Sequence, residues 1–260
     1  MQDLALKAKN LLKKLISIKS FSFNEDKTAD YIENWFTING ISSSRSVNNV
    51  YALNKNFDPN KPNLLLNSHH DTVEPNLGYT NDPFKPILKD GKLFGLGSND
   101  AGISLVCLII VFLHFNKRDD LNFNIIILAS AEEEKSGDHG IKSVMPLLPK
   151  IELAIIGEPT KMDVAIAEKG LIVFDLIVKG ESTHAAHQNN NNPIIKSSNI
   201  INKLSNFSFP KKSKLLGNVK LTVTQINAGV QHNVVPSEVK IVLDVRVNDR
   251  YTNQEIFNFL

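Results

Sequence analysis

Imidazole and carboxylate side chains follow three short apolar stretches of this sequence. Such stretches are typical of buried parallel strands, and in open α/β sheets the functional groups lie just past the carboxyl ends of those strands. The stretches and the groups that follow them are Leu64–Leu66 with His69 and Asp71, Ile125–Leu128 with Glu132–Glu134, and Leu153–Ile156 with Glu158. Imidazole nitrogen and carboxylate oxygen are ligands of ions that activate water. The sequence therefore predicts a metal site for hydrolysis, with zinc as the first candidate.

Two of these groups stand close together. His69 and Asp71 are two residues apart, so His69 can bind a metal while Asp71 holds the other ring nitrogen. Taken alone, such a pair is more often a chance surface pair. Asp100 ends the run Gly95–Asp100 before a predicted helix, and its two oxygens could bridge two ions. An aspartate in that place is otherwise a helix cap.

The glutamates Glu132–Glu134 allow a division of labour, in which one ligates an ion and another takes a proton from water. An acidic triplet is otherwise a solvated surface, and from the residues alone this alternative stays open. Glu158, in Gly-Glu-Pro-Thr, supplies one more oxygen ligand. His184 could reach over the site and stabilise an oxyanion, although a lone histidine is more often structural.

The composition is that of an ordinary globular chain. The 260 residues, 42% of them hydrophobic, suffice for a full core and allow a second domain. A net charge of +2, from 29 basic and 27 acidic residues without long blocks, argues against nucleic acid as a partner. Without a signal segment or an uncharged apolar run of roughly 18 residues, we expect a cytoplasmic protein with no membrane partner. The single cysteine, Cys107, excludes an internal disulfide, and we expect it to be buried.

Helical and strand patterns alternate through about residue 167. Apolar residues recur at helical spacing from Leu4 to Ile18, and Ser22 with Glu25 predicts a capping box for a second helix that Gly40 ends. The predicted elements that follow are a strand over 63–67, a helix over 101–115, and strands over 123–130 and 153–157. This alternation predicts an α/β fold with a doubly wound sheet.

The pattern changes at Gly170. The predicted elements are then a strand over 171–179, a helix over 193–204, and strands over 220–227 and 238–248. The order βαββ predicts a small α+β domain of the ferredoxin-like kind. We therefore place a metal-binding domain at residues 1–168 and a second domain at 169–260. Thr252 and Glu255 start a further helix close to the end of the chain, so we expect the last strand of this domain to be missing.

Four segments together resemble the M20 family of metallopeptidases and deacylases. They are Leu66–Val73, Gly91–Gly102, Ala131–Gly137 and Gly157–Thr160. The resemblance implies a zinc-hydrolase catalytic domain with His69, Asp100 and Glu158 at one ion. Asp100 and Glu134 would hold a second ion, and Co²⁺ could substitute for zinc.

The same resemblance assigns the remaining acids near the site. It implies Glu133 as the general base, Asp71 as a catalytic group beside His69, and Glu132 as a spare acid. It also implies a cis peptide bond between Asp100 and the residue that follows.

The second domain resembles the family's inserted lid and dimerisation domain in the segments Thr183–Ala186, Asn233–Pro236 and Asp244–Arg246. Thr183 stands where the family usually has glycine. The resemblance implies substrate contacts by His184, Asn233 and Arg246, in some relatives across the interface of a homodimer. Lys169 stands near the place of a carboxylate-binding arginine in relatives.

The resemblance is greatest to the acetylornithine deacetylase branch of the family. It implies removal of an N-acyl group from a small amino acid, N-acetylornithine first, in arginine biosynthesis. The alternatives are a succinyl-diaminopimelate desuccinylase, a dipeptidase, or an inactive truncated remnant. Family members continue further and supply a distal histidine to the second ion, whereas the last histidine here is His232. We therefore expect about one zinc ion per chain, against two in a complete subunit, and little deacylase activity.

Overall fold

The computed structural model describes residues 2–260. They form two compact units, unit 1 up to Met162 and unit 2 from Asp163 to Leu260. The segment 157–169 joins the last strand of unit 1 to the first strand of unit 2 and contains neither helix nor strand. The predicted domain boundary, between residues 168 and 169, lies within this segment.

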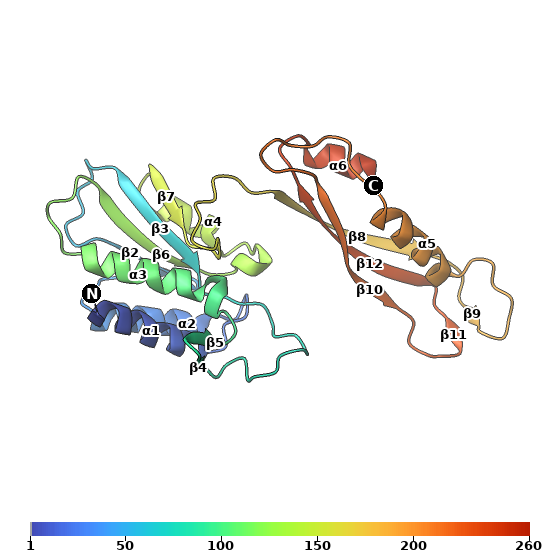
Figure 1. Ribbon diagram of the computed structural model, residues 1–260, viewed down its shortest axis with the longest axis horizontal. Helices are drawn as coiled ribbons and strands as arrows, with labels where there is room; N and C mark the ends of the chain where they lie inside the picture. Colours follow the sequence, from blue (N-terminus) through green and yellow to red (C-terminus); the bar gives the residue numbers. More distant parts are fainter. Residues whose placement is uncertain (1) are drawn as a thin grey trace. The chain divides into compact units, whose positions relative to one another are not determined.

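Unit 1 is built around a five-stranded sheet with the order β1-β2-β6-β3-β7 (Figure 1). Its strands are β1 (Ser44–Ser46), β2 (Asn49–Leu53), β3 (Asn63–His69), β6 (Asn124–Ser130) and β7 (Leu153–Ile156). β3 pairs in parallel with β6 and β7, whereas β2 pairs antiparallel with β6 and β1. A separate hairpin is formed by β4 (Ile87–Lys89) and β5 (Lys92–Phe94). The α/β prediction is confirmed, and the antiparallel edge makes the sheet mixed.

Both faces of this sheet are covered. The helices α1 (Gln2–Ile16), α2 (Asp26–Ile38) and α3 (Ile103–Phe115) pack on one face, and α4 (Ile141–Val144) packs on the other. Successive residues of a strand point to opposite faces. Ile125 and Ile127 of β6 therefore join the core beneath α1–α3, and Ile126 and Leu128 join the core around Val144. Burial on both faces explains the continuous apolar runs in β3 and β6.

α3 is the central helix of unit 1. Its core side is formed by Leu105, Val106, Ile109 and Phe112, all of them buried. Among the described residues, Ser98–Phe115 is the one helical stretch whose length and composition would suffice to cross a membrane, a test that core helices of soluble proteins also pass. With its buried side packed on α1, β3 and β6, α3 serves as such a core helix.

The other side of α3 faces solvent and carries Cys107, so the prediction of a buried cysteine is wrong. Ile103 and Val111 are also exposed, at 40% and 42%. Residues four apart share one side of a helix, so these three residues form a single stripe. Because α3 is apolar on all sides, its sequence does not distinguish the exposed stripe from the core side.

α2 begins at Asp26 rather than at Ser22 as predicted. The Ser22 hydroxyl donates to Asp71 Oδ2 at 2.7 Å, and Glu25 Oε1 accepts from the Phe23 N–H at 2.8 Å. Both side chains of the predicted capping box are therefore occupied elsewhere. Gly40 follows the helix with a positive φ of 71°, in agreement with its predicted role at the helix end.

Unit 2 contains a three-stranded antiparallel sheet with the order β10-β12-β8 and two helices on one face. Its elements are β8 (Gly170–Lys179), α5 (Pro193–Ser205), β10 (Lys220–Ala228), β12 (Glu238–Val247) and α6 (Asn253–Phe259). The short strands β9 (Thr183–His184) and β11 (Val234–Val235) form a second pair. The predicted βαββ order is confirmed, and Thr252 with Glu255 forms the predicted capping box of α6.

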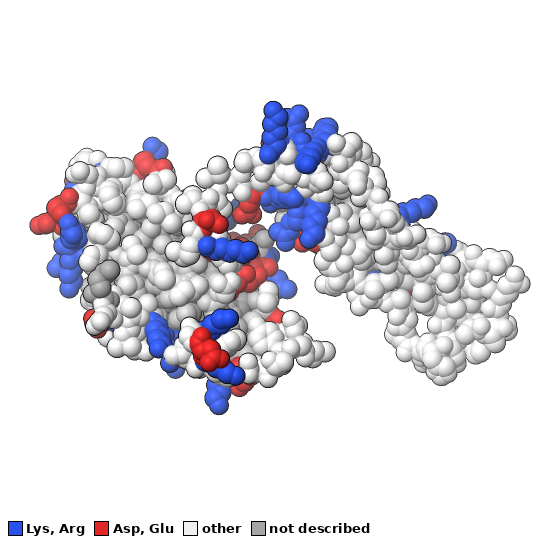
Figure 2. Space-filling view, viewed as in Figure 1, with Lys and Arg blue, Asp and Glu red and all other residues white. Residues whose placement is uncertain are grey.

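Charged side chains are spread over the surface. Figure 2 shows acidic and basic side chains intermixed on the visible face of unit 1, and several basic side chains near α6 in unit 2. One of the basic residues near α6, Lys211, forms an ion pair with Glu255. The chain has 29 basic and 27 acidic residues, and on the visible face of unit 1 neither sign forms one continuous block.

Candidate metal centre

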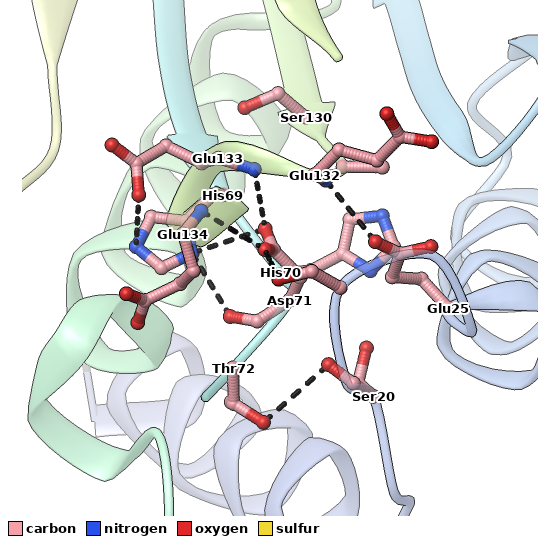
Figure 3. Close-up of polar contacts among 12 residues, drawn as sticks. Ser20, Glu25, His69, His70, Asp71, Thr72, Ser130, Glu132, Glu133 and Glu134 are labelled. Carbon is pink, nitrogen blue, oxygen red and sulfur yellow. Dashed lines mark hydrogen bonds and ion pairs between the residues drawn. The ribbon is translucent and has the colours of Figure 1, made fainter. Parts of the chain in front are cut away.

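The carboxyl ends of three neighbouring parallel strands bring the proposed ligands together. β6, β3 and β7 lie side by side, so their carboxyl ends share one edge of the sheet. His69 is the last residue of β3, Glu133 and Glu134 follow β6, and Glu158 follows β7. Figure 3 shows His69 with both glutamates at this edge. One edge therefore collects side chains from three separate parts of the sequence.

His69 is the centre of this cluster. Its ring is buried, and its Nε2 atom lies 3.2 Å from Asp100 Oδ1, 3.8 Å from Glu133 Oε2 and 3.9 Å from Glu158 Oε2. On the other side of the ring, Nδ1 lies 2.9 Å from the Asp71 carbonyl oxygen. A carbonyl only accepts, so Nδ1 carries a proton, and Nε2 can bind a metal once it has lost its own proton.

The donor set fits a zinc ion. The ligand atoms of His69, Asp100 and Glu134 lie within 4.8 Å of one another, the one such group found among residues 2–260. Ligand atoms about 2.1 Å from a four-coordinate zinc lie about 3.4 Å from one another. The distances of 3.2 Å and 3.9 Å from His69 Nε2 to Asp100 and Glu158 are close to that spacing. His69, Asp100, Glu134 and Glu158 are therefore the candidate ligands.

The crowded carboxylates shift the pKa values of this cluster. Burial raises the pKa of Glu158 to about 7, and repulsion by neighbouring carboxylates adds to the rise. Burial also raises the pKa of Glu134, with the charge of Asp100 contributing. For His69 burial acts downward, but the hydrogen bond and charge of Asp71 and the nearby glutamates raise its pKa to about 10. The site thus holds an excess of negative charge that a cation would neutralise.

Asp71 supports the cluster from beneath. Its side chain is fully buried, with Oδ1 3.4 Å from His69 Nδ1. Oδ1 accepts from the Glu133 N–H and Oδ2 from the Glu134 N–H, each at 3.1 Å, and Ser22 donates to Oδ2. Burial acts to raise the pKa of Asp71, but the hydrogen bonds from His69 and Ser22 hold it below its ordinary value. Asp71 is therefore an anion that orients both the imidazole of His69 and the turn Glu132–Glu134, here named the acidic turn.

Asp100 lies in the turn Ser98–Gly102, which leads into α3. The peptide bond between Asp100 and Ala101 is cis, as predicted. The Gly102 N–H donates to the Gly97 carbonyl at 2.9 Å, and a Cβ atom on Gly102 would lie 2.4 Å from that oxygen. The turn therefore requires glycine at position 102.

The three consecutive glutamates have three different environments. Glu132 is buried, has a positive φ of 57°, and accepts from the His139 N–H at 2.9 Å. The Glu133 side chain is exposed and extends toward His69 Nε2, and Glu134 is half-buried among the candidate ligands. The alternative of a solvated triplet is therefore wrong for Glu132, whose carboxylate stabilises its own loop.

The sequence pattern missed a second polar network behind the acidic turn. His70 is buried, its Nε2–H donates to the Asn48 carbonyl at 2.9 Å, and the Thr28 hydroxyl lies 2.9 Å from its Nδ1. Burial lowers the pKa of His70, so it is neutral. Asn48 Nδ2 in turn donates to Glu25 Oε2 at 3.0 Å, and Figure 3 shows Glu25 beside His70. Only the two adjacent histidines hinted at this network, because its other members lie far away in sequence.

The four predicted residues of unit 2 form two separate pairs. His184 lies on β9, and Asn233 immediately precedes the partner strand β11, so these two are neighbours. Arg246 lies at the other end of the main sheet, where β12 ends beside the start of β8, and Lys169 immediately precedes that start. Arg246 pairs with Asp244 on its own strand. The β12–β8 ladder, ten residue pairs long, separates the two pairs.

Comparison with known proteins connects this geometry to a family. Residues 166–260 match the M20 dimer model, described as a peptidase dimerisation domain. The chain is 30% identical over 267 residues to a succinyl-diaminopimelate desuccinylase of Rickettsia bellii, covering 94% of this chain and 68% of that protein. The protein of the same name in Rickettsia rickettsii is 30% identical over 271 residues, covering 95% of this chain and 70% of that protein. The chain belongs to the M20 family.

Solved M20 structures share the fold. A metallo-carboxypeptidase of Sulfolobus solfataricus matches with a TM-score of 0.70 at 18% identity, over 99% of this chain and 74% of that one. A Bacillus subtilis protein described as a dinuclear metal binding peptidase matches with a TM-score of 0.64 at 18% identity, over 98% of this chain and 68% of that one. M20 membership identifies the chain as a hydrolase that acts on amides.

The expectation of an acetylornithine deacetylase in arginine biosynthesis is not supported. Both M20 relatives above carry the name succinyl-diaminopimelate desuccinylase. The motifs that carried the resemblance contain the candidate ligands and the glutamates of the acidic turn, and M20 proteins with different names, a desuccinylase and a carboxypeptidase among them, match this chain. The motifs therefore identify the family without identifying the acyl amino acid.

Proposed function

We propose that this protein hydrolyses the amide bond of N-succinyl-diaminopimelate, giving succinate and diaminopimelate. The observation that carries the proposal is the 30% identity to a succinyl-diaminopimelate desuccinylase, which extends over 94% of the chain and thus over both units. The cluster of His69, Asp100, Glu134 and Glu158 supports it, since this donor set suits a metal that assists hydrolysis.

In this proposal His69, Asp100, Glu134 and Glu158 hold zinc. Zinc bound there would polarise the amide carbonyl and make water more acidic. Glu133 takes a proton from the attacking water and delivers it to the leaving amine. Its Oε2 atom lies 3.8 Å from His69 Nε2, so the carboxylate is close to the ligands without being buried among them. Asp71 fixes the ring orientation of His69 through Nδ1.

Unit 2 supplies the proposed substrate contacts. Arg246 and Lys169 would bind carboxylate groups of the substrate, which carries several. Because the ten-pair ladder between β12 and β8 separates these two residues from His184 and Asn233, the second pair would come from the other subunit of a homodimer. There the partner subunit's His184 would stabilise the oxyanion, and the partner subunit's Asn233 would donate a hydrogen bond to the substrate. We further propose a homodimer formed through residues 166–260, the segment that matches a peptidase dimerisation domain.

A specificity assay tests this function. The purified chain, with zinc supplied, is given N-succinyl-L,L-diaminopimelate, N-acetylornithine and a simple dipeptide, and released primary amine is measured. We expect the largest kcat/KM for the succinyl substrate, even where the absolute rate is low. A larger kcat/KM for the dipeptide or for N-acetylornithine would overturn the proposed substrate.

Glu133→Gln is the control variant for this assay. It keeps the size and polarity of the side chain but removes the base, which typically lowers kcat by about 100- to 10,000-fold. Zinc content should stay at the wild-type level, because Glu133 is not among the candidate ligands. Undiminished hydrolysis by this variant would refute the role of Glu133.

A further inference from the structure

Two buried carboxylates hold the acidic turn after β6 from behind. Three consecutive backbone N–H groups, those of Glu132, Glu133 and Glu134, each donate at 3.1 Å to a carboxylate oxygen. The last two reach Asp71, which the proposed mechanism already uses. The first reaches Oε1 of Glu25, a residue to which the mechanism gives no task. This turn carries both the proposed base and a candidate ligand.

Glu25 is fully buried, and every contact described for its carboxylate is with a donor. Oε1 accepts from the Phe23 N–H at 2.8 Å and from the Glu132 N–H, and Oε2 accepts from Asn48 Nδ2 at 3.0 Å. A buried carboxylate is unfavourable unless donors satisfy it, and here the donors come from three separate segments. Glu25 thus joins the start of α2, the loop before β2 and the acidic turn.

The bond to Glu132 is made at the point where the acidic turn needs support. Glu132 has a positive φ, a conformation that residues other than glycine rarely adopt. The left-handed residue reverses the chain, so that its own side chain turns into the loop while the next side chain extends toward His69 Nε2. A fixed acceptor oxygen on the Glu132 N–H favours this one arrangement of the peptide.

Glu25 also contacts the neighbours of the histidine ligand. Asn48, which donates to Glu25, accepts through its carbonyl from His70, the residue after His69. Glu25 therefore contacts groups that hold two of the segments at the metal centre, the end of β3 and the acidic turn. Figure 3 shows Glu25 beside His70, with a dashed line from the Glu132 N–H to the Glu25 carboxylate.

We propose that Glu25 is a positioning residue, which holds the Glu132 peptide so that Glu133 and Glu134 face His69. It acts through the backbone and touches neither substrate nor metal. The part of the proposal that concerns Glu133 rests on the proposed function. The part that concerns Glu134 needs only metal binding, and the two can be measured separately.

The test exchanges a carboxylate for an amide between two neighbouring positions. In Glu25→Gln the single remaining oxygen cannot accept both from the backbone N–H groups of Phe23 and Glu132 and from Asn48. With the oxygen on the backbone groups, the new NH₂ group faces the NH₂ group of Asn48. In Asn48→Asp two carboxylates face each other. The double variant Glu25→Gln with Asn48→Asp restores a donor opposite an acceptor at the same net charge. The Asn48→Asp change also keeps the side-chain oxygen that now accepts from Arg45 at 2.8 Å.

Three readouts are taken on the full chain. Zinc affinity, measured by competition with a chelator, should fall by about 10- to 100-fold in each single variant and return to within about threefold of wild type in the double variant. Hydrogen exchange of the Glu132 amide should be faster in Glu25→Gln and slow again in the double variant. With zinc saturating, kcat for the succinyl substrate should fall in the single variants while KM stays within about twofold.

The outcomes separate positioning from general stability. Thermal unfolding is followed in all four proteins. A double variant that regains the wild-type melting temperature without regaining zinc affinity would overturn the proposal, and so would a Glu25→Gln variant with wild-type zinc affinity and amide exchange. If the wild-type chain hydrolyses none of the substrates, the proposed function fails, but zinc affinity and amide exchange still decide the role of Glu25.

Discussion

Asp71→Asn should weaken both the fold of unit 1 and the binding of zinc at the candidate metal centre. The buried carboxylate accepts from the Glu133 and Glu134 N–H groups and from Ser22, and it also faces His69 Nδ1. An asparagine of the same shape offers one oxygen and one NH₂ group. Whichever way this amide turns, one of the two backbone N–H groups faces a donor and loses its partner.

The size of the effect follows from this count. A buried donor left without a partner costs about 1–3 kcal/mol, so we expect a loss of about 2 kcal/mol in the free energy of unfolding. For a unit of this size such a loss lowers the melting temperature by about 4–8 °C. The substitution would also remove the carboxylate that orients and polarises His69. Loss of such a partner typically lowers metal affinity by about 10- to 100-fold.

Thermal unfolding of the zinc-free chain and a chelator competition measure the two effects. Ser22→Ala is the matched control, because it removes one neutral donor from Asp71 and leaves the carboxylate. We expect it to cost about 1 kcal/mol and to change zinc affinity by less than about threefold. Equal zinc affinity of Asp71→Asn and the wild type would refute this account of the site.

Three further measurements address the charge of the site, the turn before α3 and unit 2. Zinc affinity should rise with pH through the raised pKa values of Glu158 (about 7) and His69 (about 10), because below these values bound protons stabilise the ion-free chain and zinc must displace them. Calorimetry at pH 7 should therefore detect more than one proton released per ion. Gly102→Ala should weaken zinc binding, since its Cβ would meet a backbone oxygen at 2.4 Å, whereas Gly170→Ala, with its nearest atom at 3.8 Å, should not. Arg246→Ala should raise KM for the succinyl substrate by about tenfold with little change in melting temperature, because this exposed ion pair contributes about 0–1 kcal/mol; an unchanged KM would contradict its proposed role.

The strands that carry the site could be predicted because a strand buried on both faces has several consecutive apolar residues. β3 and β6 each contain a run of consecutive apolar residues, Leu64–Leu66 and Ile125–Leu128, and the rule that side chains gather past the ends of parallel strands then grouped His69 with Glu134. The assignment of Glu133 as base came from family resemblance, since a run of identical residues gives no internal clue.

Contacts between residues far apart in the sequence produce no local pattern of this kind. Ser22 and Glu25 fit the spacing of a capping box, but their partners Asp71 and Glu132 lie 49 and 107 positions away. The exposed position of Cys107 was equally hidden, because α3 is apolar on every side and its sequence does not state which side other elements cover. Local spacing therefore grouped the candidate ligands better than it identified the residues that hold them in place.

The three identical glutamates have a genetic consequence. Deletion of any one of their codons gives the same protein, which keeps two glutamates where the geometry uses three side chains in three directions. The phenotype of such a deletion would therefore not reveal which glutamate was lost. For the same reason an alignment displaced by one position still matches glutamate with glutamate, yet transfers the role of base to a buried acceptor. The glutamate with positive φ is the landmark that fixes the register when roles are transferred to other members of the family.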